Sequence, residues 1–470
     1  MTTPTPPSQS NAKPSPGASP SPSPSKDGEL RARKAALGVL EAVEERGAWS
    51  TTVVPNAIKE LSDPRDRGFA AHLAYETIRW QGTLDYLMQP ACSRPLEEVE
   101  PALRRVLRLG TLQLWRSNVP PHAAVTTSVD LARGVVPHGR AQGAGGFVNG
   151  VLRAVARSLE GDGPHWPADA RERAALITGH PRWMVDDLAD RMGLERATAA
   201  LAADSESPGP TLRAVGDRDA LLAELRAAGI DAEPGMNAPE SIRISGVDPR
   251  TIPAVIEGRA RPQDEASMMV VHAAQVQPGD RVLDLCAGPG GKTTHLATLT
   301  GPTGSVVAVE MHQHRAQAIE RAAETLGVDG WVQVRVADAA HPQLHEDDRF
   351  DVILLDAPCS GLGTGRRRPE VRWKRTPSDV EALGALQRRL LASAGRWLAP
   401  GGRLVYAVCT WTAGETDDVV DAATPSGMVV ESRRQLLPDV EDTDGMYLAV
   451  LTHASHRAAP SAGADDIPLV

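Results

Sequence analysis

The chain has 470 residues, a length that predicts about three domains of ordinary size. Its 50 lysine and arginine residues against 60 aspartate and glutamate residues give a net charge of -10, which excludes a small basic protein that coats nucleic acid by charge alone. The four cysteines form no close pair, which excludes a zinc site of two Cys-x-x-Cys knuckles and a secreted disulfide framework, and no apolar run reaches the roughly 18 residues of a membrane span. We therefore expect a cytoplasmic protein of several domains, with no membrane and no metal partner.

The two ends of the chain differ in composition from the rest. Residues 1–27 are rich in proline and serine and almost lack large apolar side chains, so they cannot bury enough surface to offset the entropy of ordering. We predict a disordered tail over residues 1–27 and a flexible tail over residues 456–470.

Residues 28–165 carry the pattern of an all-helical domain. Apolar residues such as Leu37, Leu40 and Val43 recur at spacings of three and four, as on the buried face of an amphipathic helix. Prolines within 62–64 and 118–121 predict turns, because proline removes a donor and clashes with the preceding helical turn.

The second half of the chain changes to mixed patterns. Residues 175–258 combine helical segments with short apolar ones at 211–215 and 241–244, which predicts a small α+β linking module. Over residues 259–455, short apolar strands alternate with amphipathic helices, which predicts an α/β Rossmann-like domain with a parallel sheet covered on both faces. Because such sheets bind ligands at the carboxyl ends of their strands, the functional motifs are expected there.

A glycine-rich turn follows the first predicted strand of this domain, residues 281–285, and places glycines where a backbone turns tightly and approaches a ligand. A phosphate-binding P-loop would need glycine six residues before Lys292, where Cys286 stands. A dinucleotide fingerprint begun at Gly288 would need glycine or alanine where Thr293 stands. A nucleoside cofactor without a pyrophosphate is the interpretation that remains.

Two carboxylates support this interpretation. Glu310 ends the second strand, where it could accept hydrogen bonds from both ribose hydroxyls, and Asp338 follows the third strand, where an adenine amino group would lie. The turn and the two acids together favour S-adenosylmethionine. A structural turn with capping or solvated acids is the alternative, above all for Asp338.

Cys359 and Cys409 each follow an apolar strand, so both thiols are expected at the edge that carries the glycine-rich turn. A single cysteine at a strand end is usually a small buried hydrophobic residue. Two cysteines beside a proposed methyl donor favour a catalytic role instead. Carbon-5 of cytosine becomes nucleophilic only after a nucleophile such as a thiolate adds to carbon-6, and a base must later remove the carbon-5 proton. Asp356, three residues before Cys359, could contact the base ring or the methionine amino group of the cofactor, or serve as a turn residue.

A run of cations after the first of these cysteines is a candidate RNA contact, with a solvated loop as the alternative. Residues 366–375 contain Arg366, Arg367, Arg368, Arg372, Lys374 and Arg375.

The motifs at 286–293, 358–359 and 409–410 resemble those of the Sun/Fmu family of RNA cytosine-5 methyltransferases. The resemblance implies that Cys409 is the nucleophile and that Cys359 helps to release the product. It also implies that the cofactor contacts are Cys286, Ala287, Gly288, Pro289, Gly290, Gly291, Lys292, Glu310, Asp338 and Asp356.

The N-terminal half, through 147–153 and 180–183, resembles the NusB-like domain of bacterial RsmB-type 16S rRNA enzymes. This implies an all-α NusB-like RNA-binding domain, and 16S ribosomal RNA is the expected partner and substrate. Two alternatives remain open. One is cytosine-5 methylation of tRNA, for which the catalytic domain would be the same, and the other is a non-catalytic RNA-binding factor of ribosome assembly.

Overall fold

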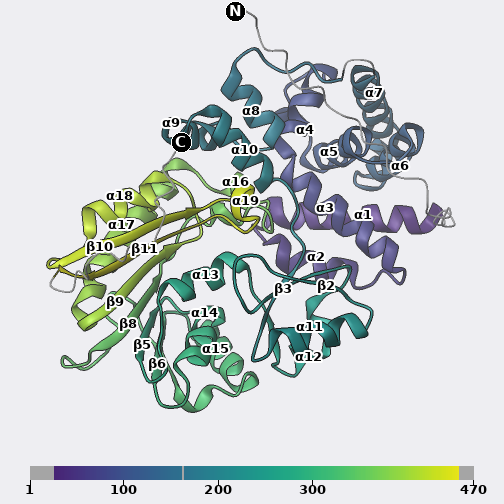
Figure 1. Ribbon diagram of the computed structural model, residues 1–470. Coiled ribbons are helices and arrows are strands. Elements are labelled where there is room, and N and C mark those ends of the chain that lie inside the picture. Colours follow the sequence, from purple (N-terminus) through teal and green to yellow (C-terminus); the bar gives the residue numbers. More distant parts are fainter. Residues whose placement is uncertain (1–25, 161–162, 455–470) are drawn as a thin grey trace, which may run out of the picture.

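The structure is a computed structural model that describes residues 26–160 and 163–454 (Figure 1). The predicted tails lie outside the described residues, apart from Lys26 and Asp27, which begin the first helix. Within the described ranges, no helix is both long enough and apolar enough to cross a membrane.

The N-terminal domain is all-helical, as predicted. Its helices are α1 (Lys26–Glu45), α2 (Ser50–Ile58), α3 (Pro64–Arg79), α4 (Gln81–Met88), α5 (Pro101–Arg116), α6 (Pro121–Gly134) and α7 (Ala141–Leu159). Asp63 caps α3 by accepting a hydrogen bond from the Arg65 backbone, and Pro64 takes the first helical position, where no donor is needed. Leucines and valines such as Leu73 and Val106 fill one core shared by these helices.

Three further helices follow, α8 (Ala170–Thr178), α9 (Arg182–Met192) and α10 (Leu194–Asp204). Their buried residues, among them Val185 and Leu201, pack against Leu362 and Trp411 of the C-terminal half. These helices therefore pack with the C-terminal domain instead of the core of the small sheet that comes next in the chain.

The small sheet is four-stranded and antiparallel, in the order β2-β3-β1-β4. Its strands are β1 (Thr211–Ala214), β2 (Asp231–Pro234), β3 (Ser241–Ser245) and β4 (Ala260–Pro262), with helices α11 (Arg218–Ala227) and α12 (Pro253–Ile256). The predicted α+β module is therefore present, and its last strand reaches into the residues that we expected to open the next domain.

The large sheet has seven strands in the order β10-β11-β9-β8-β5-β6-β7. Five run parallel: β5 (Arg281–Leu285), β6 (Ser305–Glu310), β7 (Val332–Val336), β8 (Phe350–Asp356) and β9 (Leu398–Val408). The sequence did not predict the antiparallel hairpin that completes the sheet, β10 (Met428–Leu436) and β11 (Met446–His453).

Helices cover both faces of this sheet, as predicted (Figure 1). One face packs against α13 (Glu265–Ala273), α14 (Gly291–Thr300) and α15 (Gln313–Thr325). The other packs against α17 (Pro377–Ala394) and α18 (Asp417–Ala423). Because the five parallel strands share one direction, the residues that follow them gather at one edge of the sheet.

Candidate active site

The glycine-rich turn lies at this edge, between β5 and α14, and its geometry requires glycine. Gly290 has a φ of +94°, and a Cβ there would lie 3.0 Å from the Cα of Ile319 on α15. A Cβ on Gly288 would lie 2.3 Å from a carboxylate oxygen of Glu310. The turn therefore brings its backbone directly against the acid at the end of β6.

Glu310 and Asp338 lie at the ends of neighbouring strands, as the sequence predicted. Glu310 is 5% exposed and accepts hydrogen bonds from the backbone of Gly288 (3.1 Å) and His312 (2.8 Å). Asp338 is exposed and accepts one from the backbone of Ala340 (2.9 Å), so its carboxylate also supports a turn. Each carboxylate oxygen has a second lone pair, and these acids can still accept hydrogen bonds from a ligand.

One apolar residue at this edge was not singled out from the sequence. Met311, directly after Glu310, is 60% exposed, an unusual position for a long apolar side chain. It presents an apolar surface beside the acid, and its only sequence signal is its place after the strand-end glutamate.

Lys292 and Asp356 form an ion pair at the ends of β8 and of the turn, with 2.7 Å between Nζ and Oδ2. Burial disfavours the charged lysine, but the Asp356 carboxylate outweighs it, so the pKa of Lys292 is raised. Asp284 of β5, which was not singled out from the sequence, is fully buried and accepts a 2.6 Å hydrogen bond from the Thr293 hydroxyl. Burial raises the pKa of Asp284 to about 7.

The two predicted thiols lie side by side, although 50 residues separate them: the Sγ atoms of Cys359 and Cys409 are 3.3 Å apart. All four cysteines are free, and Cys286 lies in the glycine-rich turn with a φ of +63°. The hydrogen bond from Cys359 lowers the pKa of the Cys409 thiol, and the cations Arg368 and Lys292 act in the same direction against burial. The same hydrogen bond and burial raise the pKa of Cys359. Cys409 is therefore the member of the pair that is more readily a thiolate.

A buried carboxylate, Glu415, organises the chain around the thiols. It accepts hydrogen bonds from the Ser360 backbone (2.7 Å), the Ser360 hydroxyl (2.5 Å), the Thr412 hydroxyl (2.8 Å) and the Gln387 amide (3.1 Å). These contacts tie the residue after Cys359 to the loop after Cys409. The sequence places an acid in that loop but gives no sign of these partners.

The cationic run 366–375 is not one exposed basic surface, so both interpretations offered for it are wrong for its buried members, Arg366 and Arg372. Arg372 is 1% exposed and donates to Asp204 (2.8 Å), and Arg366 is 6% exposed and donates to Asp442 (2.8 Å). Arg367 pairs with Asp264 (2.8 Å). Only Arg368 of the six is classed as exposed. Three of the six cations thus pair with anions far away in the sequence, whereas Lys374 and Arg375 donate to backbone carbonyls.

Glu240, His272 and His295 bring a carboxylate and two imidazoles together, with their ligand atoms within 4.8 Å of one another. Both imidazoles contact the carboxylate through Nε2, at 2.9 Å for His272 and 3.1 Å for His295. Burial lowers the pKa of His295 to about 4, although the hydrogen bond to Glu240 opposes it. These hydrogen bonds account for the cluster, which joins the small sheet to α13 and α14. The expected absence of a metal stays a prediction.

The fold and this edge define a class: a Rossmann-like methyltransferase domain, preceded by a helical domain and a small sheet. The family of 16S rRNA methyltransferases RsmB/F matches residues 271–452, the NusB family matches 30–157, and the ferredoxin-like domain of RsmF/B-like methyltransferases matches 180–249.

Whole-length relatives agree. A Mycobacterium tuberculosis protein, whose name assigns it only to the methyltransferases, is 38% identical over 450 residues, which cover 89% of this chain and 96% of that protein. Ribosomal RNA small subunit methyltransferase B of Pseudomonas syringae is 31% identical over 457 residues, covering 92% and 99%. The solved structure of PH0851 shares the fold with a TM-score of 0.75 at 22% identity, covering 90% and 98% of the two chains. The chain belongs to the RsmB/F family of ribosomal RNA small subunit methyltransferases.

Proposed function

We propose that the protein transfers the methyl group of S-adenosylmethionine to carbon-5 of a cytosine in 16S ribosomal RNA. The observation that carries the proposal is the pair of thiols 3.3 Å apart, at the edge that also holds the glycine-rich turn and Glu310. The names of relatives that cover nearly the whole chain support 16S rRNA over tRNA as the substrate. The free cysteines and an RNA substrate support the cytoplasm as its location.

The residues at the edge fit S-adenosylmethionine, which supplies an electrophilic methyl group when bound. We assign the ribose hydroxyls to Glu310 and the adenine side to Asp338 and Met311, while the backbone of 286–291 lies close enough to line the site. Lys292 holds the Asp356 carboxylate in place, so that its free oxygen can accept from an amino group of the cofactor or of the base.

In the proposed reaction, the Cys409 thiolate adds to carbon-6 of the cytosine and forms a carbon–sulfur bond, which makes carbon-5 nucleophilic. Carbon-5 then takes the methyl group. Once Cys409 is bonded to carbon-6, Cys359 loses its own proton to solvent and, as a thiolate within reach of the same adduct, removes the proton from carbon-5. Elimination breaks the bond to Cys409 and restores the aromatic ring. The two groups are thus a nucleophile and a base in contact with each other, and the cycle ends with Cys409 as the thiolate, Cys359 as the thiol and one proton released to solvent.

The proposal is tested by incubating the protein with labelled S-adenosylmethionine and either 16S rRNA or tRNA, followed by bisulfite sequencing of the product. We expect label in 16S rRNA and one class of cytosine that resists conversion. If only tRNA were labelled, the substrate would be tRNA and not 16S rRNA. If neither RNA were labelled, a non-catalytic assembly factor would describe the protein better.

The cofactor assignment predicts that Glu310→Ala weakens binding of S-adenosylmethionine by about 1.5–3 kcal/mol, because the ribose hydroxyls lose a charged acceptor. Titration calorimetry measures this directly. Glu310→Gln keeps one acceptor oxygen for the turn and should lose less affinity. Glu324→Ala, at an exposed glutamate near the far end of α15, is the control and should bind like the wild type. Equal affinity for wild type and Glu310→Ala would contradict the assignment.

A further inference from the structure

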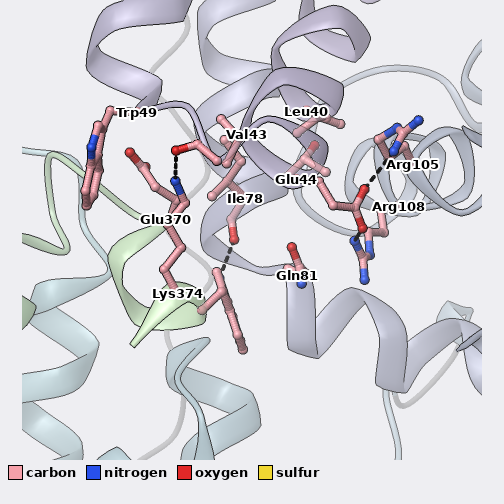
Figure 2. Close-up of a pocket in the computed structure, with 13 residues that line it drawn as sticks. Leu40, Val43, Glu44, Trp49, Ile78, Gln81, Arg105, Arg108, Glu370 and Lys374 are labelled. Atoms are coloured by element: carbon pink, nitrogen blue, oxygen red, sulfur yellow. Dashed lines mark hydrogen bonds and ion pairs between the residues drawn. The ribbon is translucent and has the colours of Figure 1, made fainter. Parts of the chain in front are cut away.

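A cavity of about 400 Å³ lies outside the catalytic edge, where the helical domain meets the segment that follows Cys359 (Figure 2). One wall comes from the helical domain, around Trp49 and Ile78, and the other from Glu370, Trp373 and Lys374. Cavities of this volume accommodate small molecules or single planar groups.

The two walls are fastened to each other by buried hydrogen bonds. Glu370 accepts from the backbone (2.8 Å) and hydroxyl (2.7 Å) of Ser50, and the Trp373 indole donates to the Ile78 carbonyl (2.6 Å). Lys374 donates to the Gly47 carbonyl (2.7 Å). The cavity is therefore a fixed feature of the domain interface.

Most charged groups of the lining already have partners. Glu370 is bound by Ser50, and Glu44 is paired with Arg105 (3.0 Å) and Arg108 (3.3 Å), on the side of the cavity across from Trp49 in Figure 2. The groups of the lining that remain free to bind a ligand are neutral hydrogen-bonding side chains among apolar ones.

Two neutral polar side chains of the lining have no partner. Thr77 is 1% exposed and its hydroxyl has no hydrogen-bond partner in the structure. The Gln81 carboxamide, also in the lining, forms no hydrogen bond with any described residue. A buried hydroxyl without a partner costs free energy, so the site is suited to a ligand with donors and acceptors. A carboxamide and a hydroxyl match the edge of a nucleobase.

The rim of the cavity has the features of a stacking platform. Trp49 is 37% exposed, Lys374 lies 4.6 Å from its ring centroid, and Arg368 lies 5.9 Å from it. Arg368 makes no ion pair within the described part of the chain. An indole flanked by cations stacks on bases and neutralises the adjoining phosphates.

Two observations relate the cavity to Cys359 and Cys409. Arg368 contacts Trp49 and is also close enough for its charge to act on Cys409. The second wall is part of the segment that continues directly from Cys359. An RNA strand with its cytosine at the thiols would then lie near this rim.

We propose that the cavity receives the base of an unpaired nucleotide that neighbours the target cytosine, with Trp49 stacking on the RNA and Thr77 and Gln81 contacting the base edge. This inference rests on the proposed function. It makes the helical domain part of substrate recognition at the catalytic site.

The test is steady-state methylation of 16S rRNA by Trp49→Ala and Trp49→Phe. Loss of one stacked base should raise KM for the RNA by about 5- to 100-fold and leave kcat nearly unchanged, whereas phenylalanine should keep most of the affinity. The salt dependence of RNA binding should be unchanged for Trp49→Ala and flatter for Arg368→Gln. Trp166→Ala, which removes a partly buried indole that follows the helical domain and stacks on its Tyr86, is the matched control. Calorimetry with S-adenosylmethionine and far-UV circular dichroism show that each variant is folded.

A second measurement identifies the occupant. Synthetic single-stranded RNAs around the methylated cytosine carry an abasic ribose at each neighbouring position in turn. The abasic ribose at one position should weaken binding to the wild type and have no effect on binding to Trp49→Ala.

An unchanged KM for Trp49→Ala, or equal sensitivity of both proteins at every position, overturns the inference. If the wild-type protein is active in that experiment, the proposed function still stands. Micromolar binding of free nucleoside 5′-monophosphates without any effect on RNA affinity would also overturn it and make the cavity a small-molecule site. If the wild type methylates no RNA, the proposed function fails first.

Discussion

The variant Cys359→Ser is expected to accumulate as a covalent complex with its RNA. Serine at position 359 can still donate a hydrogen bond to the Cys409 sulfur 3.3 Å away in the native pair, so attack on carbon-6 and methyl transfer continue. A hydroxyl is far too weak an acid to become the base that removes the carbon-5 proton at neutral pH. The adduct therefore persists, and a denaturing gel shows protein retarded by RNA.

The variant Cys409→Ser should lose methylation almost completely and form no adduct, because a serine hydroxyl does not supply the anion. The double variant should behave in the same way. Cys92→Ser, which changes a partly buried cysteine of the helical domain, is the control and should retain activity without an adduct.

Two outcomes would contradict this scheme. An adduct on Cys409→Ser would show that Cys359 is the nucleophile and that the two roles are reversed. Activity in both single variants without any adduct would remove covalent catalysis, and the thiols would be packing residues at strand ends.

The second large effect, a loss of stability, is expected from replacing Arg372, the buried arginine in the segment after Cys359. Arg372 donates to Asp204 (2.8 Å), to the Ser205 hydroxyl (2.9 Å) and to the Gly179 carbonyl (3.1 Å), and both Arg372 and Asp204 have side chains that are 1% exposed. Arg372→Ala removes the cation that faces the buried Asp204 carboxylate, leaves it with His180 Nε2 (3.1 Å) as its partner, and should lower the free energy of unfolding by about 3–5 kcal/mol. Urea unfolding followed by circular dichroism measures the loss.

The matched control is an exposed arginine. Arg182, 39% exposed, binds Asp186 at 2.9 Å and Asp169 at 2.8 Å, and Arg182→Ala should cost about 1 kcal/mol because solvent screens the charges. Replacing both buried partners by apolar residues, Arg372→Met with Asp204→Leu, should recover much of the stability lost in Arg372→Ala. If Arg372→Ala lowered the free energy of unfolding by no more than the exposed control does, the pair of Arg372 and Asp204 would not stabilise the segment after Cys359.

Much of the organisation of this protein is local in origin and was therefore predictable. Helical periodicity defines the N-terminal domain, and alternating strands and helices define the C-terminal one. Because parallel strands end at one edge, residues such as Glu310 and Cys409 could be placed there from their positions after strands alone. The glycines of the turn also indicated a close backbone approach, which the structure shows at Gly288 and Gly290.

The tertiary structure determined the features that depend on contacts between residues far apart in the chain. The 3.3 Å contact of Cys359 with Cys409 requires that β8 and β9 pair as neighbours in the sheet. The periodicity of the sequence does not determine the order of the strands. The run 366–375 has the composition of a solvated basic loop, yet Arg372 is buried because Asp204 lies across from it, 168 residues earlier. An arginine is exposed or buried according to whether an anion meets it in the interior, and only the folded chain brings that anion to it.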